Sequence, residues 1–195
     1  LITISGDTIF ENSDFSVSAF PVQHRGADCL GFTFVEKGRR PFLPEKADAL
    51  NIQPGPWRRD LVEGKAVTLP DGRTIEPDMV LGDFRPGTRL VHIGDVGELD
   101  DLMDVTRGAD ALVIEATYMN QEAEMARQFG HMTAARAATF ARDAGVGQLI
   151  LTHISRRYRE KEVLQEAQAI FPGAVVARDF DVFQIKSAEK ENPGE

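Results

Sequence analysis

Three of the four histidines in this chain stand next to apolar segments, at their ends or starts. His24 closes SVSAFPVQH, His153 closes LILTH, and His131 opens an alanine-rich segment. Asp95 closes a further apolar segment, TRLVHIGD. Imidazole and carboxylate groups are the ligands that a borderline metal such as zinc takes in proteins. One such residue at a strand end is ordinarily capped or hydrogen-bonded, but several together favour a metal site made by His24, Asp95 and His153.

The elements that must position these residues alternate along the second half of the chain. Strands are expected at residues 88–95, 111–117, 148–155 and 174–185, and helices at 98–108, 131–146 and 160–173. Apolar strands separated by helices predict an α/β sheet that is covered on its faces. Thr133 is the expected N-cap of the 131–146 helix, and Gly145 its C-terminal stop. His92 lies inside the first of these strands and is expected in the core, not at a metal.

The first part of the chain has a different pattern. Alternating apolar residues predict a half-buried strand at 14–24 that pairs with a neighbour at 27–37. The residues LITIS, at 1–5, also have the composition of a strand. A strand pair followed by α/β units indicates a layered sandwich and not a pure doubly wound sheet.

Residues 37–73 differ from both parts. They contain five prolines, the only tryptophan, and eight Lys or Arg against five Asp or Glu. One interpretation is an ordinary surface excursion. The other is a projecting arm that meets an anionic partner, because Trp57 beside Arg58 and Arg59 offers stacking together with charge. Further basic residues of this arm are Lys37, Arg39 and Arg40.

The bulk composition sets limits on the class of protein. The chain has 195 residues, enough for one domain with a real core, and a net charge of −9. That charge argues against a general nucleic-acid binder, because phosphate backbones are held by Lys and Arg. No apolar run approaches the ~20 residues of a membrane span. The single cysteine, Cys29, is expected to be a buried thiol, which predicts the reducing cytoplasm.

The order of the motifs QHRG, CLGF, GPW, IGD, EAT, GHMT and LTHISRRY resembles ribonuclease Z, the transfer-RNA 3′-processing endonuclease of the metallo-β-lactamase fold. The resemblance runs from about Phe15 to Ile185. It implies an α/β protein, an αββα sandwich of which this chain is the C-terminal portion. The expected core comprises residues 1–36 and 74–195, and residues 37–73 would be an inserted flexible arm that binds transfer RNA (tRNA).

The resemblance also assigns roles. Two zinc ions would share Asp95, with His24 and His153 as further ligands. His131 would face the scissile phosphate and Glu115 would orient it, so these two are the expected catalytic pair. The expected substrate-binding residues are Arg157 of the RRY sequence together with Trp57, Arg58, Arg59, Lys37, Arg39 and Arg40.

The implied reaction removes the 3′ trailer from precursor tRNA, leaving a 3′ hydroxyl on the tRNA and a 5′ phosphate on the trailer. The short form of the family further implies a homodimer with no membrane association. Three departures from the family pattern are Val96, Ile114 and Met132, where the family usually has G-D-T, H-E-A-T and H-S-T. Each departure spares the residue to which chemistry is assigned and bears on the tuning around it.

One family motif is absent from the sequence. The signature H-x-H-x-D-H, which supplies most ligands of the metal pair, does not occur in these 195 residues. We therefore expect the chain to be a fragment that is inactive alone. Two alternatives stay open: a hydrolase of small phosphodiesters with the same fold, which would not need the arm, and a non-catalytic RNA-binding half. The second alternative would carry the arm without Asp95, His131 and His153.

Overall fold

The computed structural model describes residues 8–187, which form two compact units. The smaller unit spans Gly38–Gly87, and the larger unit comprises the described residues before and after it. Each has a hydrophobic core of its own, so each is described by itself. The strand expected at residues 1–5 lies outside the described residues.

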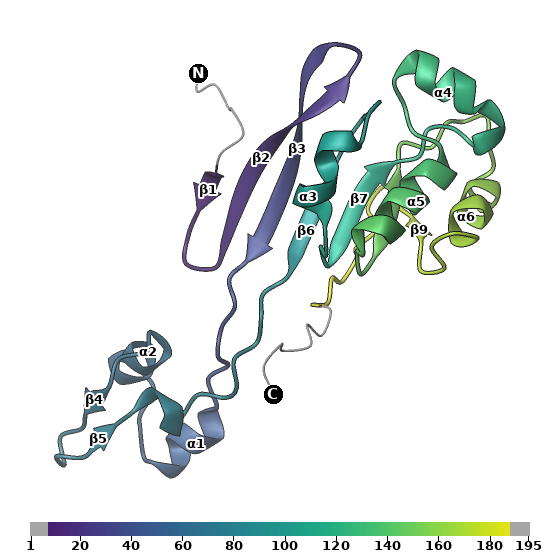
Figure 1. Cartoon of the computed structure of the whole chain (residues 1–195). Helices are drawn as coiled ribbons and strands as arrows, with labels where there is room; N and C mark the ends of the chain where they lie inside the picture. The colour runs from purple at the N-terminus through teal and green to yellow at the C-terminus, as the bar shows by residue number, and fades with distance from the viewer. Residues whose placement is uncertain (1–7, 188–195) are drawn as a thin grey trace. The chain divides into compact units, whose positions relative to one another are not determined.

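A seven-stranded mixed sheet is the frame of the larger unit (Figure 1), with the strand order β1-β2-β3-β6-β7-β8-β9. The pairs from β1 to β6 are antiparallel, and those from β6 to β9 are parallel. The strand bounds are β1 Thr8–Glu11, β2 Phe15–His24, β3 Ala27–Glu36, β6 Arg89–His92, β7 Ala111–Glu115, β8 Leu149–Thr152 and β9 Val175–Val176.

The strand directions decide where functional side chains can gather. Two successive antiparallel pairings separate β2 from β6, so β2 runs in the same direction as β6, β7 and β8. The carboxyl ends of these four strands therefore lie at one edge of the sheet. Loops at such an edge are where α/β proteins place functional groups.

Helices connect the parallel strands, as crossover connections require. Their bounds are η2 Asp100–Leu102, α3 Met103–Thr106, η3 Asn120–Glu122, α4 Ala123–Phe129, α5 Ala134–Ala144 and α6 Glu160–Gln168. The single helix expected at 98–108 is instead a 3₁₀ turn followed by one α turn. The helix after β7 is confirmed, with its N-cap: the Thr133 hydroxyl accepts from the Arg136 N–H at 3.1 Å. Gly145 ends α5 in the left-handed conformation, at φ 66°.

The main core lies between α5 and one face of the sheet. Strand residues such as Val91, Leu112 and Leu151 are fully buried against the alanine face of α5. Small side chains let that helix approach the sheet closely. The opposite face is more exposed: Phe34 is 39% accessible. His92 is also exposed, so the expectation that it lies in the core is wrong, because strand alternation turns Val91 inward and His92 outward.

The strand expected at 174–185 is much shorter in the structure. β9 contains only two residues, and residues 177–187 lie outside the sheet. A turn follows the strand, in which the Asp181 N–H donates to the Arg178 carbonyl at 3.1 Å. Phe180 and Val182 are almost fully exposed, so this apolar pattern does not indicate burial.

The smaller unit is a folded body and not an irregular excursion. It contains α1 Pro44–Ala49, α2 Pro56–Val62, β4 Val67–Thr68, β5 Thr74–Ile75 and η1 Pro77–Met79. Ile52, Leu61 and Val80 are fully buried in its core. Proline at the start of both helices fits their first turn, where no N–H is needed.

The smaller unit ends at Gly87, beyond the expected boundary at residue 73. Residues 74–87 belong to the same unit, because β5 pairs with β4, and backbone bridges join Arg39 to Arg85 and Phe42 to Leu81. This extension removes the expected basic character, because Gly38–Gly87 contains eight Lys or Arg and eight Asp or Glu. No helix among residues 8–187 is long and apolar enough to cross a membrane.

Candidate metal and catalytic site

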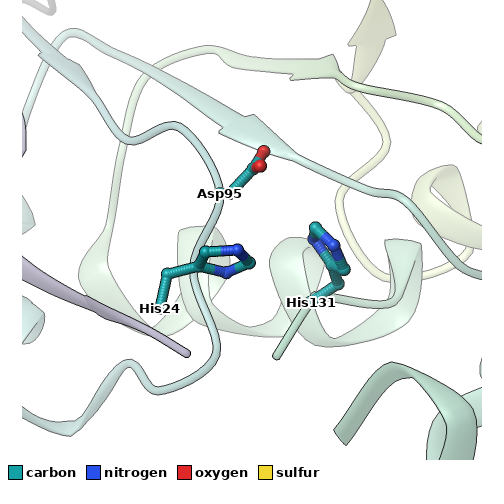
Figure 2. A group of neighbouring side chains, drawn as sticks. All are labelled: His24, Asp95 and His131. Atoms are coloured by element: carbon teal, nitrogen blue, oxygen red, sulfur yellow. The ribbon is translucent and has the colours of Figure 1, made fainter. Parts of the chain in front are cut away.

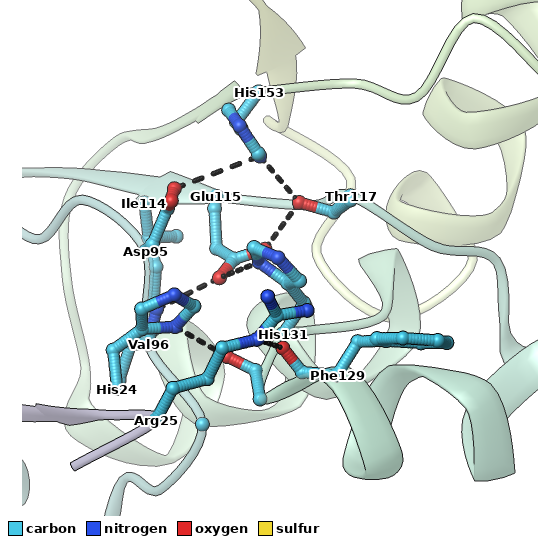
Figure 3. A network of polar contacts seen from close by, with 12 residues as sticks. His24, Arg25, Asp95, Val96, Ile114, Glu115, Thr117, Phe129, His131 and His153 are labelled. Carbon is cyan, nitrogen blue, oxygen red and sulfur yellow. Dashed lines mark hydrogen bonds and ion pairs between the residues drawn. The ribbon is translucent and has the colours of Figure 1, made fainter.

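Five of the predicted site residues meet at the carboxyl edge of the sheet (Figures 2 and 3). His24 is the last residue of β2, Asp95 follows β6, Glu115 ends β7, and His153 follows β8. His131 comes from the loop between α4 and α5. Five separate segments of the chain thus contribute to one site.

His24 is oriented by a backbone carbonyl. Its Nδ1 lies 2.8 Å from the Gly130 carbonyl oxygen. A carbonyl can only accept, so Nδ1 carries the proton and Nε2 keeps its lone pair. Close backbone packing maintains this contact: a Cβ on Gly97 would lie 3.2 Å from the Gly130 Cα. The neighbouring Arg25 donates from Nε to the Phe129 carbonyl at 2.6 Å.

Glu115 is the buried centre of the hydrogen-bond network in Figure 3. Its side chain is fully inaccessible and accepts from the Val96 backbone N–H at 2.7 Å. His131 Nδ1 lies 2.9 Å from one carboxylate oxygen and 3.1 Å from the other. The Thr117 hydroxyl donates to the same carboxylate. These donors offset the cost of burying the charge.

His153 has an unusual backbone. Its φ is 56°, in the left-handed region that residues other than glycine seldom adopt. Backbone conformations of this kind cost free energy, and they persist where contacts with the surrounding structure stabilise them, often at functional sites. Its Nδ1 lies 2.6 Å from the Thr117 hydroxyl oxygen and 3.6 Å from an Asp95 carboxylate oxygen. Its ring stacks on that of His131, with centroids 5.4 Å apart.

The predicted ligands do not all surround one point. Donor atoms of His24, Asp95 and His131 lie within 4.8 Å of one another, as do those of Glu115, His131 and His153. Within residues 8–187, His24 and His153 do not share such a group. Asp95 is close to each of them separately. The structure therefore brings the predicted residues together, but in two groups and not around one point.

The donor chemistry fits a zinc-type ion. Atoms bound to one zinc at ~2.1 Å lie about 4 Å or less apart. Asp95 is 41% exposed and His153 51%, so both remain open to an ion. Glu115 is less suited as a ligand, because Val96, His131 and Thr117 already hold its carboxylate.

Thr117 is a site residue that the sequence analysis did not single out. It is 8% exposed and contacts both Glu115 and His153. Its position two residues after Glu115 could have indicated this role, because residues two apart in an extended chain point to the same side. The three departures from the family pattern are core positions: Val96, Ile114 and Met132 are all fully buried.

The predicted RNA-binding residues are distributed unevenly. In the smaller unit, the Arg58 guanidinium donates to the Ile52 carbonyl and pairs with Asp48. Trp57 packs against that unit's core, whereas Arg59 is exposed.

Three of the other four predicted basic residues have side-chain partners in the fold. Arg39 is exposed, and Arg40 donates to the Gly82 carbonyl at 2.8 Å. In the larger unit, Lys37 pairs with Glu11 at 2.8 Å, and Arg157 with Glu122 at 3.3 Å.

Comparison with known proteins supports the fold. The family model of the beta-lactamase superfamily domain matches residues 75–154. The chain is 44% identical over 178 residues to ribonuclease Z of Bradyrhizobium diazoefficiens, a match that covers 91% of this chain and 59% of the relative. The chain thus spans about three fifths of the length of the curated relatives it matches.

Two solved structures share the fold. The metallo-β-lactamase fold protein YhfI of Bacillus subtilis has a TM-score of 0.60 at 18% identity, over 94% of this chain and 55% of that one. Human short-form tRNase Z has a TM-score of 0.54 at 23% identity, over 92% of this chain and 45% of that one. The chain therefore has the metallo-β-lactamase fold and matches the ribonuclease Z family over most of its length.

Proposed function

We propose that this chain supplies one part of the active site of a zinc-dependent endoribonuclease that removes the 3′ trailer from precursor tRNA. The products would be a tRNA with a 3′ hydroxyl and a trailer with a 5′ phosphate. The observation that carries the proposal is the meeting of His24, Asp95, His131 and His153 around the buried Glu115. The similarity to a ribonuclease Z supports the reaction class.

The proposed zinc ligands in this chain are His24, Asp95 and His153. When bound, zinc supplies positive charge for the phosphodiester oxygens and lowers the pKa of a bound water. Asp95 is suited to be shared between two ions, because a carboxylate offers two oxygens and this one lies near both histidines. The His24 ring is held by the Gly130 carbonyl, which keeps its Nε2 available as a donor.

The proposed catalytic pair is His131 with Glu115. The Glu115 carboxylate accepts the Nδ1 proton of His131 and so leaves Nε2 as the atom that can exchange a proton. We place that atom at the ribose 3′ oxygen that leaves when the chain is cut. General acid help of this kind contributes ~10²–10⁴ in rate.

The smaller unit is the proposed tRNA contact. Its net charge of zero means that binding would depend on individual exposed residues and not on a broad basic field. Arg59 and Arg39 are exposed and suited to phosphate contacts. Arg58 is occupied within the fold, so we assign it to the stability of this unit.

The test uses two proteins: this chain alone, and this chain joined to a segment that carries the missing H-x-H-x-D-H signature, here called the completed protein. Each is incubated with Zn²⁺ and a precursor tRNA with a 3′ trailer, and the product ends are mapped. We expect cleavage after the tRNA 3′ end only by the completed protein. Cleavage at other sites, or a 3′ phosphate on the tRNA, would contradict the proposal.

Deletion of residues 38–87 distinguishes a tRNA endonuclease from a hydrolase of small phosphodiesters. We expect the deletion to impair tRNA cleavage by the completed protein but to spare hydrolysis of bis(p-nitrophenyl) phosphate. An equal loss of both activities would show that the smaller unit is structural only. The resemblance also implies a homodimer, and sedimentation of the completed protein tests that proposal.

A further inference from the structure

The hydroxyl of Thr117 lies between a buried carboxylate and a proposed metal ligand (Figure 3). It donates to Oε2 of Glu115, and its oxygen is 2.6 Å from Nδ1 of His153. Thr117 is 8% exposed and Glu115 is fully buried, so bulk water has little access to the hydrogen bond between them, whereas the His153 side chain is 51% exposed.

A count of protons fixes the direction of both hydrogen bonds. A threonine hydroxyl has one proton, and a carboxylate can only accept. The Thr117 proton is therefore taken by Glu115, whose other contacts are the Val96 N–H and His131. The remaining role of the Thr117 oxygen toward His153 is that of an acceptor. Nδ1 of His153 must then carry a proton.

Asp95 does not offer an equivalent partner for that proton. Its nearer carboxylate oxygen is 3.6 Å from His153 Nδ1, which is too long for a hydrogen bond. The reverse arrangement, in which Thr117 donates to His153, would leave its oxygen lone pairs facing the Glu115 carboxylate. That contact would be repulsive and would leave a buried acceptor without its donor.

We propose that Thr117 is a positioning residue that fixes His153 in the tautomer protonated at Nδ1, so that Nε2 is the unprotonated nitrogen offered to a cation. Glu115 then governs two histidines: His131 directly and His153 through the Thr117 hydroxyl. The inference deepens the proposed function, on which the ligand role of His153 rests. Residues that orient a metal-binding histidine in this way typically change metal affinity by ~10–100-fold when they are mutated.

The test measures the His153 tautomer by long-range ¹H–¹⁵N correlation on the metal-free chain, at a pH where its imidazoles are neutral. We expect the wild-type chain to show a protonated Nδ1 at His153. Thr117→Ser keeps the hydroxyl and should preserve this state, whereas Thr117→Val should shift His153 toward protonation at Nε2. Thr152→Val is the matched control, because the Thr152 hydroxyl donates to the Ile114 carbonyl at 3.4 Å.

Zinc competition against a chromophoric chelator gives a second readout in the completed protein. Thr117→Val should lower zinc affinity by about 10–100-fold, and Thr117→Ser should restore most of it. A wild-type His153 protonated at Nε2, or an unchanged tautomer in Thr117→Val, would overturn the inference even if tRNA is cleaved. Conversely, the expected tautomers without tRNA cleavage would reject the proposed function and leave the tautomer assignment standing.

Discussion

Nδ1 of His131 lies 2.9 Å from Oε1 and 3.1 Å from Oε2 of Glu115, a carboxylate with no solvent exposure. Both oxygens are within reach of one ring nitrogen, so the imidazole cannot rotate away without leaving a buried charge short of a donor. This pair joins the end of β7 to the loop before α5. The contact fixes the orientation of the His131 ring, so Glu115 positions a site residue in addition to packing in the core.

Replacing Glu115 with Gln tests the orienting role. The amide keeps the shape and can still accept the Val96 N–H, but it can no longer accept equally from His131 and Thr117 on both arms. We expect single-turnover cleavage of precursor tRNA by the completed protein to fall by ~10²–10⁴. Glu124→Gln, at an exposed ion pair with Arg127, is the control and should cleave at the normal rate. A Glu115→Gln protein with full activity would remove Glu115 from the mechanism.

Removal of the Asp95 carboxylate tests its sharing between two ions. We expect the completed protein to bind two zinc ions, and Asp95→Ala to bind fewer than two, as measured by elemental analysis after dialysis. The physical reason is that Asp95 would be a ligand of both ions, so its loss would weaken the binding of each. Asp101→Ala, which removes an exposed carboxylate near Gln23, should keep both ions. Two tightly held ions in Asp95→Ala would contradict the shared role.

Much of the candidate site could be predicted from the sequence, because its residues occur at strand ends. His24 and Glu115 end strands β2 and β7, and His153 follows β8, and the shared direction of these strands places their ends at one edge. Their pairing in space depends on loops, and loop geometry is not encoded in hydrophobic periodicity. The left-handed backbone of His153 and the carbonyl contact of His24 are examples.

The smaller unit shows a different limit of sequence reasoning. Its prolines and charges indicated a projecting, flexible arm, yet Ile52 in a loop, Leu61 in α2 and Ile75 in β5 form a core. Isolated apolar residues give no periodic signal when each helix has only two turns. Composition alone therefore misplaced the end of the unit and overstated its positive charge.

Arg59→Gln tests the proposed RNA contact of the smaller unit. Loss of one phosphate contact should reduce the slope of log affinity against log salt by about 0.7–0.9. Binding of precursor tRNA to the completed protein at several salt concentrations measures this slope. Arg73→Gln removes the same charge from a residue paired with Asp71 and should change the slope less. Identical slopes in wild type and Arg59→Gln would exclude Arg59 from phosphate binding.

Thr133 is the N-cap of α5, and it stands two residues after His131 in the chain. Its hydroxyl caps α5 by accepting the Arg136 N–H at 3.1 Å, and the residue is 4% exposed. Thr133→Ala should lower the free energy of unfolding by about 1 kcal/mol, because one N–H of the first turn loses its acceptor. Urea denaturation of this chain measures the change, with exposed Thr68→Ala in β4 as the control. Thr133→Ser retains an acceptor and should recover most of the loss. If Ser and Ala destabilised the chain equally, the effect would come from the lost methyl group and its packing, and the cap would contribute nothing.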